Sequence, residues 1–98
     1  MTINKTLNDT ELTIAPEGRL DTVSSPELEK EIDTSLENVT SLILDLAKLE
    51  YISSSGLRVL LKAQKIMSKK GEMKVTNVNE MIMEIFEVTG FSDILTIE

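Results

Sequence analysis

The run Leu-Ile-Leu-Asp-Leu at residues 42–46 is the feature that most restricts the fold of this chain. Its apolar residues fall on both faces of an extended strand, which is typical of a central strand covered on two sides. A helix is predicted to begin a few residues later, within the Ser-Ser-Ser-Gly sequence at residues 53–56, and to end at a left-handed Gly71. A short strand at residues 73–76 follows. Because strands joined by a helix usually run parallel, the chain is predicted to contain a parallel sheet.

The N-terminal part of the chain predicts a hairpin followed by a helix. Residues 2–15 indicate two strands around an Asn-Asp turn at residues 8–9, since apolar and polar residues alternate there. The sequence Pro-Glu-Gly at residues 16–18 is expected to break the second strand. The sequence Ser-Ser-Pro-Glu at residues 24–27 then predicts a helix with a serine cap and an early proline.

The C-terminal part of the chain predicts a further helix and strand. The sequence Asn-Val-Asn-Glu at residues 77–80 is typical of a capping box, and Gly90 is expected to close the helix that follows. Residues 91–94 predict one more turn, and residues 95–97 predict a last strand. The whole pattern indicates an α/β fold with a mainly parallel sheet and an antiparallel hairpin at its start.

Composition excludes several kinds of chemistry. The chain has no histidine and no cysteine, so it lacks the usual zinc ligands, a catalytic thiol, a Ser–His pair and any disulfide. Its 10 basic and 17 acidic residues give a net charge of −7, which works against binding nucleic acid or an anionic membrane. It lacks a Gly-rich phosphate loop, and no metal or cofactor is expected. Without a long apolar segment or a signal-peptide pattern, the protein is expected to be cytoplasmic.

Ser53, Ser54 and Ser55 are the candidate functional residues, because they stand where a strand ends and a helix begins. One interpretation is simply a well-capped helix. The other is a regulated hydroxyl, since a phosphate would add a charge of about −1.5 to −2 that a helix N-terminus tolerates. A protein partner covering the same spot would have to bury that charge. Hydrolytic catalysis is not favoured, because Ile52 stands where a nucleophile elbow needs glycine.

Three motifs follow one another along the chain. Residues 18–21 read Gly-Arg-Leu-Asp, residues 52–57 read Ile-Ser-Ser-Ser-Gly-Leu after Leu-Asp-Leu at residues 44–46, and residues 86–91 read Phe-Glu-Val-Thr-Gly-Phe. Together they resemble the signature of STAS domains, and specifically of bacterial anti-sigma factor antagonists. The resemblance implies a single STAS domain over residues 1–98, with a mixed, mainly parallel sheet of four to five strands covered by three to four helices.

The resemblance also implies a function without catalysis. Members of this family bind an anti-sigma factor, itself a serine/threonine kinase that uses ATP, and release it when they are phosphorylated. A PP2C-type phosphatase restores the binding form, and the cycle regulates transcription by partner switching. Carried over onto this chain, the acceptor is Ser54, with Ser53 and Ser55 as alternatives. Ser53 replaces the family's Asp and Ala47 replaces a Ser, so the acceptor has lost a neighbouring negative charge.

The resemblance further implies a surface that contacts the partner. Its residues are Asp21, Ser53, Ser55, Gly56, Leu57 and Arg58. Asp21 is equally compatible with a structural turn, Arg58 with a solvent-exposed side chain, and Asp45 with holding the loop before the serines. The alternative function is a constitutive STAS adaptor, bound to a transporter ATPase or acting as a signalling scaffold, which needs no phosphorylation.

Overall fold

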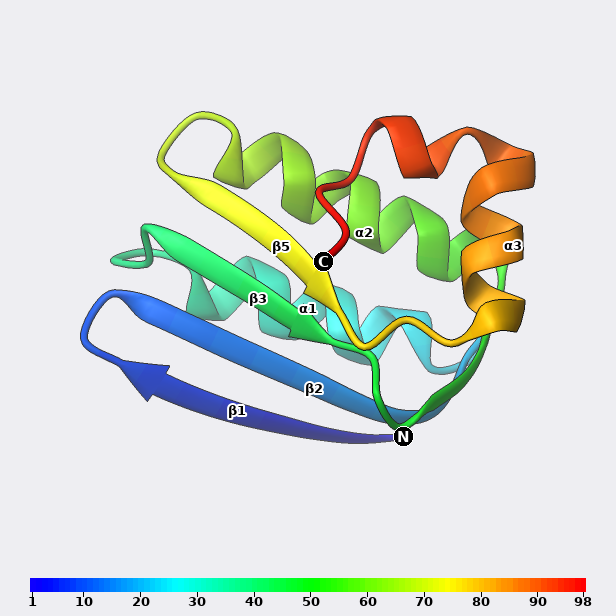
Figure 1. Cartoon of the computed structure of the whole chain (residues 1–98). Helices are drawn as coiled ribbons and strands as arrows, with labels where there is room; N and C mark the ends of the chain where they lie inside the picture. The colour runs from blue at the N-terminus through cyan, green and yellow to red at the C-terminus, as the bar shows by residue number, and fades with distance from the viewer.

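The computed structural model describes residues 1–98 and contains five strands and three helices, in which a pair of strands or a single strand precedes each helix. The elements are β1 (Thr2–Asn8), β2 (Glu11–Leu20), α1 (Ser25–Ser35), β3 (Ser41–Asp45), β4 (Leu49–Ile52), α2 (Ser54–Met67), β5 (Glu72–Thr76), α3 (Glu80–Thr89) and a short 3-10 helix, η1 (Phe91–Asp93). Strands β1 and β2 form an antiparallel hairpin, and every other strand pairing is parallel. The mixed, mainly parallel sheet expected from the sequence is therefore confirmed (Figure 1).

Strand β2 organises the sheet because it pairs with two parallel partners in succession. The strand order is β1-β2-β3-β5, and β4 pairs with the second half of β2. Residues 11–14 of β2 lie beside residues 41–44 of β3, and residues 18–20 lie beside residues 49–52 of β4. The carboxyl ends of β2 and β4 consequently meet at the same edge of the sheet, where Leu20 pairs with Ile52.

The core lies between the sheet and the helices behind it. Helices α1 and α2 run behind the sheet in Figure 1, and α3 lies at the carboxyl ends of the strands. The buried side chains include Leu12 and Ile14 of β2, Leu42 and Leu44 of β3, Met73 and Val75 of β5, Leu28 and Ile32 of α1, Leu60 and Met67 of α2, and Ile82 and Phe86 of α3. Ile43 is only half-buried, because no helix crosses the front of β3 (Figure 1). The predicted coverage of β3 on two faces was therefore wrong.

Strand β2 does not break at Pro16, which contradicts the sequence prediction. Pro16 lies opposite Ile3 of β1, between the segments of β2 that pair with β3 and β4. Its missing N–H therefore interrupts neither parallel ladder. Gly18 follows with a φ of +97°, and the pairing with β4 shifts register there. The sequence Pro-Glu-Gly bends the strand instead of ending it.

The helix ends match the predictions in part. Gly90 is left-handed, with a φ of +82°, and closes α3 as expected. Asn79, not Asn77, caps α3, because its side chain accepts a hydrogen bond from the N–H of Ile82 at 2.9 Å. Gly71 is not left-handed. A Cβ at Gly71 would lie 1.8 Å from the carbonyl oxygen of Thr40, so a close backbone approach requires the glycine there.

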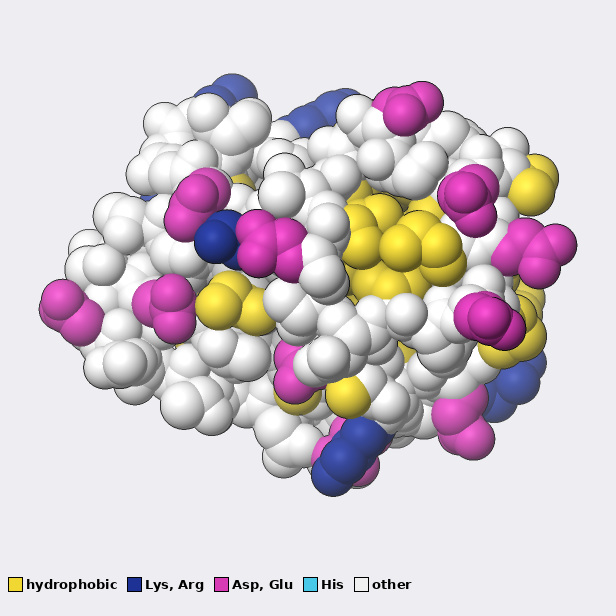
Figure 2. All heavy atoms as spheres, in the orientation of Figure 1, with side chains coloured by type: hydrophobic (Ala, Val, Ile, Leu, Met, Phe, Trp, Pro, Cys, Tyr) yellow, Lys and Arg dark blue, Asp and Glu magenta, His cyan; other side chains and the backbone are white.

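Two elements at the edges of the fold differ from expectation. Strand β4 was not predicted, and the last strand, predicted at residues 95–97, is reduced to a single parallel bridge between Val75 and Ile97. The expected turn after α3 is present as η1. Apolar side chains gather in a hollow between this C-terminal segment and α3 (Figure 2). Every helix falls short of the combination of length and hydrophobicity that crossing a membrane requires.

Candidate functional site

Ser53 is the residue that caps helix α2. Its backbone is extended, with φ −95° and ψ 177°, and its Oγ accepts a hydrogen bond from the N–H of Gly56 at 3.3 Å. Its own N–H donates to the carbonyl oxygen of Leu20 at 2.8 Å, which ties the cap to the end of β2. The capping interpretation therefore applies to Ser53, whose hydroxyl and backbone are both engaged.

Ser54 and Ser55 occupy the first turn of α2 in different environments. Ser54 is the first residue of the helix and is exposed, and no intramolecular hydrogen bond engages its hydroxyl. Ser55 is half-buried and lines a shallow cleft of about 240 Å³. The other residues that line this cleft are Thr22, Ser25, Pro26, Glu29, Arg58 and Val59. The cleft lies between the first turns of α1 and α2, so Ser55 stands beside the positive ends of two helix dipoles, and Ser54 stands at the positive end of α2.

Gly56 and Leu57 lie beneath this surface. Both are buried, and a Cβ at Gly56 would come within 2.8 Å of Cγ1 of Ile52 and of Cγ of Leu20. Glycine therefore lets the first turn of α2 pack directly against the ends of β2 and β4. Arg58, in contrast, is exposed. Of these three expected partner-binding residues, only Arg58 has an exposed side chain.

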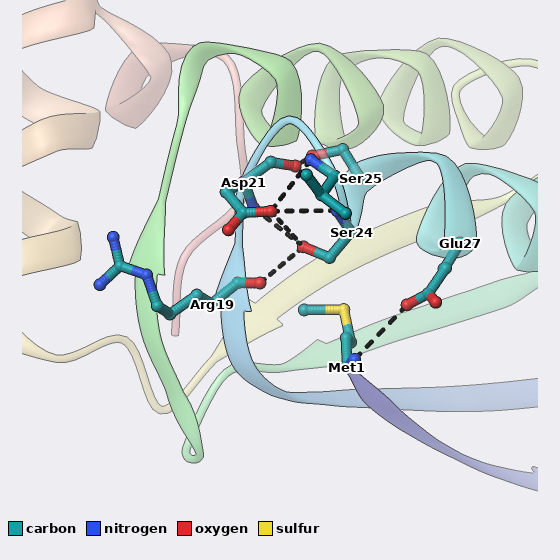
Figure 3. Close-up of polar contacts among 7 residues, drawn as sticks. Met1, Arg19, Asp21, Ser24, Ser25 and Glu27 are labelled. Carbon is teal, nitrogen blue, oxygen red and sulfur yellow. Dashed lines mark hydrogen bonds and ion pairs between the residues drawn. The ribbon is translucent and has the colours of Figure 1, made fainter.

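Asp21 holds the turn that follows β2. Its Oδ1 accepts hydrogen bonds from the backbone N–H groups of Val23 and Ser24, both at 3.0 Å. The hydroxyl of Ser24 lies 3.1 Å from the same oxygen and 2.6 Å from the carbonyl oxygen of Arg19, while Ser24 Oγ accepts from the N–H of Asp21. Figure 3 shows Asp21 turned toward Ser24 and Ser25, with the guanidinium of Arg19 pointing away. The geometry fits the structural role considered for Asp21.

The hydrogen bonds to Asp21 also determine its charge. The hydrogen bond from the Ser24 backbone N–H, and secondly that from the Ser24 hydroxyl, lower the pKa of Asp21 from its ordinary value of 3.8. Asp21 is thus a carboxylate at neutral pH. It directly follows Leu20, and Ser53 directly follows Ile52 in the paired strand. The Asp21 turn and the start of α2 therefore adjoin at one edge of the sheet.

The structure also shows features that the sequence analysis missed. Val23 is 86% exposed at the tip of the Asp21 turn, and the guanidinium carbon of Arg19 lies 4.3 Å from the centre of the Tyr51 ring on the neighbouring strand. A serine cap was predicted within residues 24–27, but Ser24, which stands at the N-cap position of α1, makes no capping hydrogen bond with its side chain. The Asp-x-x-Ser spacing at residues 21–24 was the available signal, since Asp side chains commonly accept hydrogen bonds from backbone N–H groups a few residues later.

Asp45 belongs to a different loop. Its Oδ1 accepts from the N–H of Ala47 at 3.0 Å and from Nδ2 of Asn77 at 2.9 Å. The structural role expected for Asp45 is therefore confirmed, but the loop that it holds lies between β3 and β4, and β4 separates this loop from the serines. No group of three or more acidic side chains is placed to hold a metal ion.

Comparisons with known proteins match this architecture. The sequence profile of the STAS domain family matches residues 2–98. The anti-sigma-B factor antagonist of Bacillus subtilis (strain 168) is 32% identical over 91 residues, which cover 92% of this chain and 82% of that protein. The crystal structure of an anti-sigma factor antagonist from Mycobacterium paratuberculosis superposes with a TM-score of 0.89 at 22% identity, covering 98% of this chain and 83% of that one.

A second solved structure also superposes on the chain. It is that of the Bacillus cell fate determinant SpoIIAA in its phosphorylated form, with a TM-score of 0.77 at 18% identity, covering 99% of this chain and 91% of that one. At this level of identity, the likeness shows a common fold. The profile match over residues 2–98 and the identity to the Bacillus subtilis protein show that the chain belongs to the STAS domain family.

Proposed function

We propose that this chain is an anti-sigma factor antagonist whose affinity for its partner is switched by phosphorylation of Ser54. One observation carries the choice of residue. Ser54 is exposed at the first position of α2, whereas the hydroxyl of Ser53 caps the helix and Ser55 is half-buried. A kinase needs an accessible hydroxyl, so Ser54 is the serine of this cluster that best fits a phosphoacceptor. The names of the relatives support the class of function.

The start of α2 would tolerate the phosphate. The first N–H groups of a helix have no intrahelical partner, and the dipole favours a negative group there by about 0.3–1 kcal/mol. A partner pressed against Ser54 meets the opposite situation, because it must desolvate a group of charge about −1.5 to −2. Each tenfold loss of affinity requires about 1.4 kcal/mol. Phosphorylation would therefore release the partner without unfolding the domain.

The proposed contact surface surrounds Ser54. Ser55 and Arg58 lie in the same cleft, and Asp21 positions the neighbouring turn that exposes Val23. Gly56 and Leu57 support this surface from the core, and Ser53 fixes its edge. The proposal treats residues 1–98 as one STAS domain that binds proteins and does not catalyse a reaction. Its partners would be an anti-sigma factor serine/threonine kinase and a PP2C-type phosphatase in the cytoplasm.

The replacement of the family's Asp by Ser53 is compatible with this mechanism. Asp and Ser are both strong N-cap residues, and Ser53 fulfils that task here. The exchange removes a negative charge beside the acceptor, so recognition by the kinase or phosphatase would differ from that of Asp-bearing relatives. Phosphorylation of Ser53 itself would place the phosphate on the hydroxyl that now caps Gly56.

The first test is an intact mass of the protein purified from its own host, with fragmentation across residues 51–62. We expect a single phosphate on Ser54 under at least one condition of growth, starvation or stress. Phosphate on Ser53 or Ser55 would assign the role of phosphoacceptor to that residue instead of Ser54. The absence of phosphate under all of these conditions would favour the constitutive adaptor.

Binding variants test the consequence of phosphorylation. The Ser54→Ala variant should hold the partner kinase in the presence of ATP, and Ser54→Asp should weaken binding by about tenfold or more, as expected for a charge buried at an interface. Thr34→Ala serves as the matched control, because it removes an exposed hydroxyl from α1 outside the proposed contact surface, and it should bind like wild type. Wild-type binding by both Ser54 variants would refute the assignment.

A further inference from the structure

The outer face of α2 carries an unusual share of the chain's positive charge. Of the 10 basic residues in this chain of net charge −7, five line one groove of about 530 Å³ along α2 and its C-terminal end. These five are Arg58, Lys62, Lys65, Lys69 and Lys70, and the half-buried Leu61 and Ile66 lie among them. We call this surface the basic groove. On the sheet face seen in Figure 2, acidic side chains are scattered widely, and basic side chains show at the upper edge, where α2 lies in Figure 1, and at a few separate places elsewhere.

Two of the five cations are already engaged within the molecule. The ammonium of Lys62 lies 2.8 Å from Asp33 and 3.2 Å from Glu29 of α1, and these hydrogen bonds, first that with Asp33, raise the pKa of Lys62. Lys70 donates to the carbonyl oxygens of Leu36 and Glu37 after α1. Both side chains therefore hold α1 against α2, which makes the groove a fixed surface.

The other three cations have no acidic partner. Arg58, Lys65 and Lys69 are exposed and form none of the intramolecular ion pairs, which involve other basic groups. Arg58 and Lys65, seven residues apart, lie on one side of α2, and Lys69 lies in the turn that follows the end of this helix. At a rise of about 1.5 Å per residue, Arg58 and Lys65 are about 10 Å apart along the groove, and Lys69 lies beyond Lys65. A second helix lying in the groove would present carboxylates to all three if its acidic residues had the same spacing.

We propose that the basic groove is a docking surface for an acidic helical segment of a partner protein. The apolar side chains of Leu61 and Ile66 lie between the cations, which suits an amphipathic helix with leucine or isoleucine beside its carboxylates. A nucleic acid fits less well, because none of the chain's three aromatic residues lines the groove and the net charge repels a polyanion. A flat anionic membrane would also approach the carboxylates of Glu29 and Asp33, which border the groove through Lys62.

The groove is continuous with the proposed phosphoacceptor site but does not depend on it. Arg58 lines both the basic groove and the cleft that contains Ser55. A partner that covers the start of α2 would therefore reach the groove with its next segment. The attraction in the groove comes from fixed lysine and arginine charges, so it operates whether or not Ser54 is ever phosphorylated.

The test is a titration of the ¹⁵N-labelled full chain, followed by NMR, with a designed helical peptide. The peptide carries Glu residues seven and four residues apart and leucines on the same face, and a second peptide carries Lys in place of each Glu. We expect the acidic peptide alone to shift amide signals, concentrated at residues 58–70.

Reversing two charges in Lys65→Glu/Lys69→Glu should weaken binding about tenfold. The matched control is Lys30→Glu, because Lys30 is an exposed helical lysine of α1 without an ion pair, and it should bind like wild type. Raising the salt from 50 to 500 mM should also weaken binding, because the Debye length falls to a few ångströms.

Three results would overturn the proposal. They are an absence of peptide binding at low salt, equal binding by the double variant, and shifts centred on another face. Tighter binding of a DNA duplex or of phosphatidylglycerol vesicles at the same amides would assign the groove to a different class of ligand. The Ser54→Ala variant is titrated in parallel and should bind the peptide like wild type. Failure of the Ser54 switch and failure of the groove are then distinguishable.

Discussion

Replacing Gly56 by alanine should destabilise the domain although alanine is the better helix former. The added Cβ would lie 2.8 Å from Cγ1 of Ile52 and from Cγ of Leu20, and 2.9 Å from Cδ2 of Leu20. Ordinary carbon contacts are about 3.5–4.0 Å, so α2 or its neighbours must move by about 1 Å. Leu20 and Ile52 are 0% and 2% exposed, and neither can turn into solvent. Such overpacking costs about 1–3 kcal/mol, and the gain in helix propensity offsets up to about 1 kcal/mol of that. With the full offset, we therefore expect a net loss of up to about 2 kcal/mol in the free energy of unfolding.

Urea unfolding followed by circular dichroism measures this loss, with two variants for comparison. Ser55→Ala adds no atoms in the same turn and should change stability least. Gly71→Ala should be the most destabilising, because its Cβ would lie 1.8 Å from the backbone oxygen of Thr40 and only a backbone shift can relieve that contact. A midpoint for Gly56→Ala equal to or above that of wild type would refute the argument that close packing, not conformation, requires glycine at this position.

Two further predictions concern the groups that position the site. Ser53→Ala should lower the free energy of unfolding by about 1 kcal/mol because the helix cap is lost, whereas Ser53→Asp should keep wild-type stability. Thermal unfolding compares the two variants, and an equal loss of stability in both would contradict the capping role. Because the pKa of Asp21 is lowered in the folded state, Asp21 contributes stability that is present above its unfolded pKa and is lost as the pH falls through its folded pKa. Asp21→Asn should therefore reduce stability at neutral pH and flatten its fall in acid. Urea unfolding at a series of pH values measures both effects, and an unaltered profile in Asp21→Asn would refute this reasoning.

The alternation of strands and helices was predictable because it rests on local patterns. The apolar run of β3 and the capped ends of α2 and α3 are each encoded within about a dozen neighbouring residues. Strand β4 was missed because residues 49–52 are few and acquire their partner, residues 18–20, from a distant part of the chain. The same pairing explains why β2 continues beyond Pro16. In both places tertiary contacts override a local signal.

Glycine positions show a similar limit. Gly71 was selected correctly as a special position, but from a helix-ending pattern that predicts a left-handed backbone. The reason in the structure is the approach of the Thr40 carbonyl, which links the start of β5 to the segment before β3. A left-handed helix end and a close backbone contact both require glycine. The sequence pattern alone therefore does not show which of the two reasons applies at Gly71.

The serine cluster shows where structure adds most to sequence. Three identical residues in a row have the same chemistry, and only their positions relative to the helix distinguish them. The extended backbone of Ser53 directs its hydroxyl to the N–H of Gly56, and the first turn of α2 exposes Ser54 and half-buries Ser55. Since the cap fixes which serine comes first in the helix, a variant such as Ser53→Asp should restore the family's charge beside Ser54 without displacing it. Ser53 thus separates two properties that a single Asp combines in the family motif, the cap of α2 and a negative charge next to the acceptor.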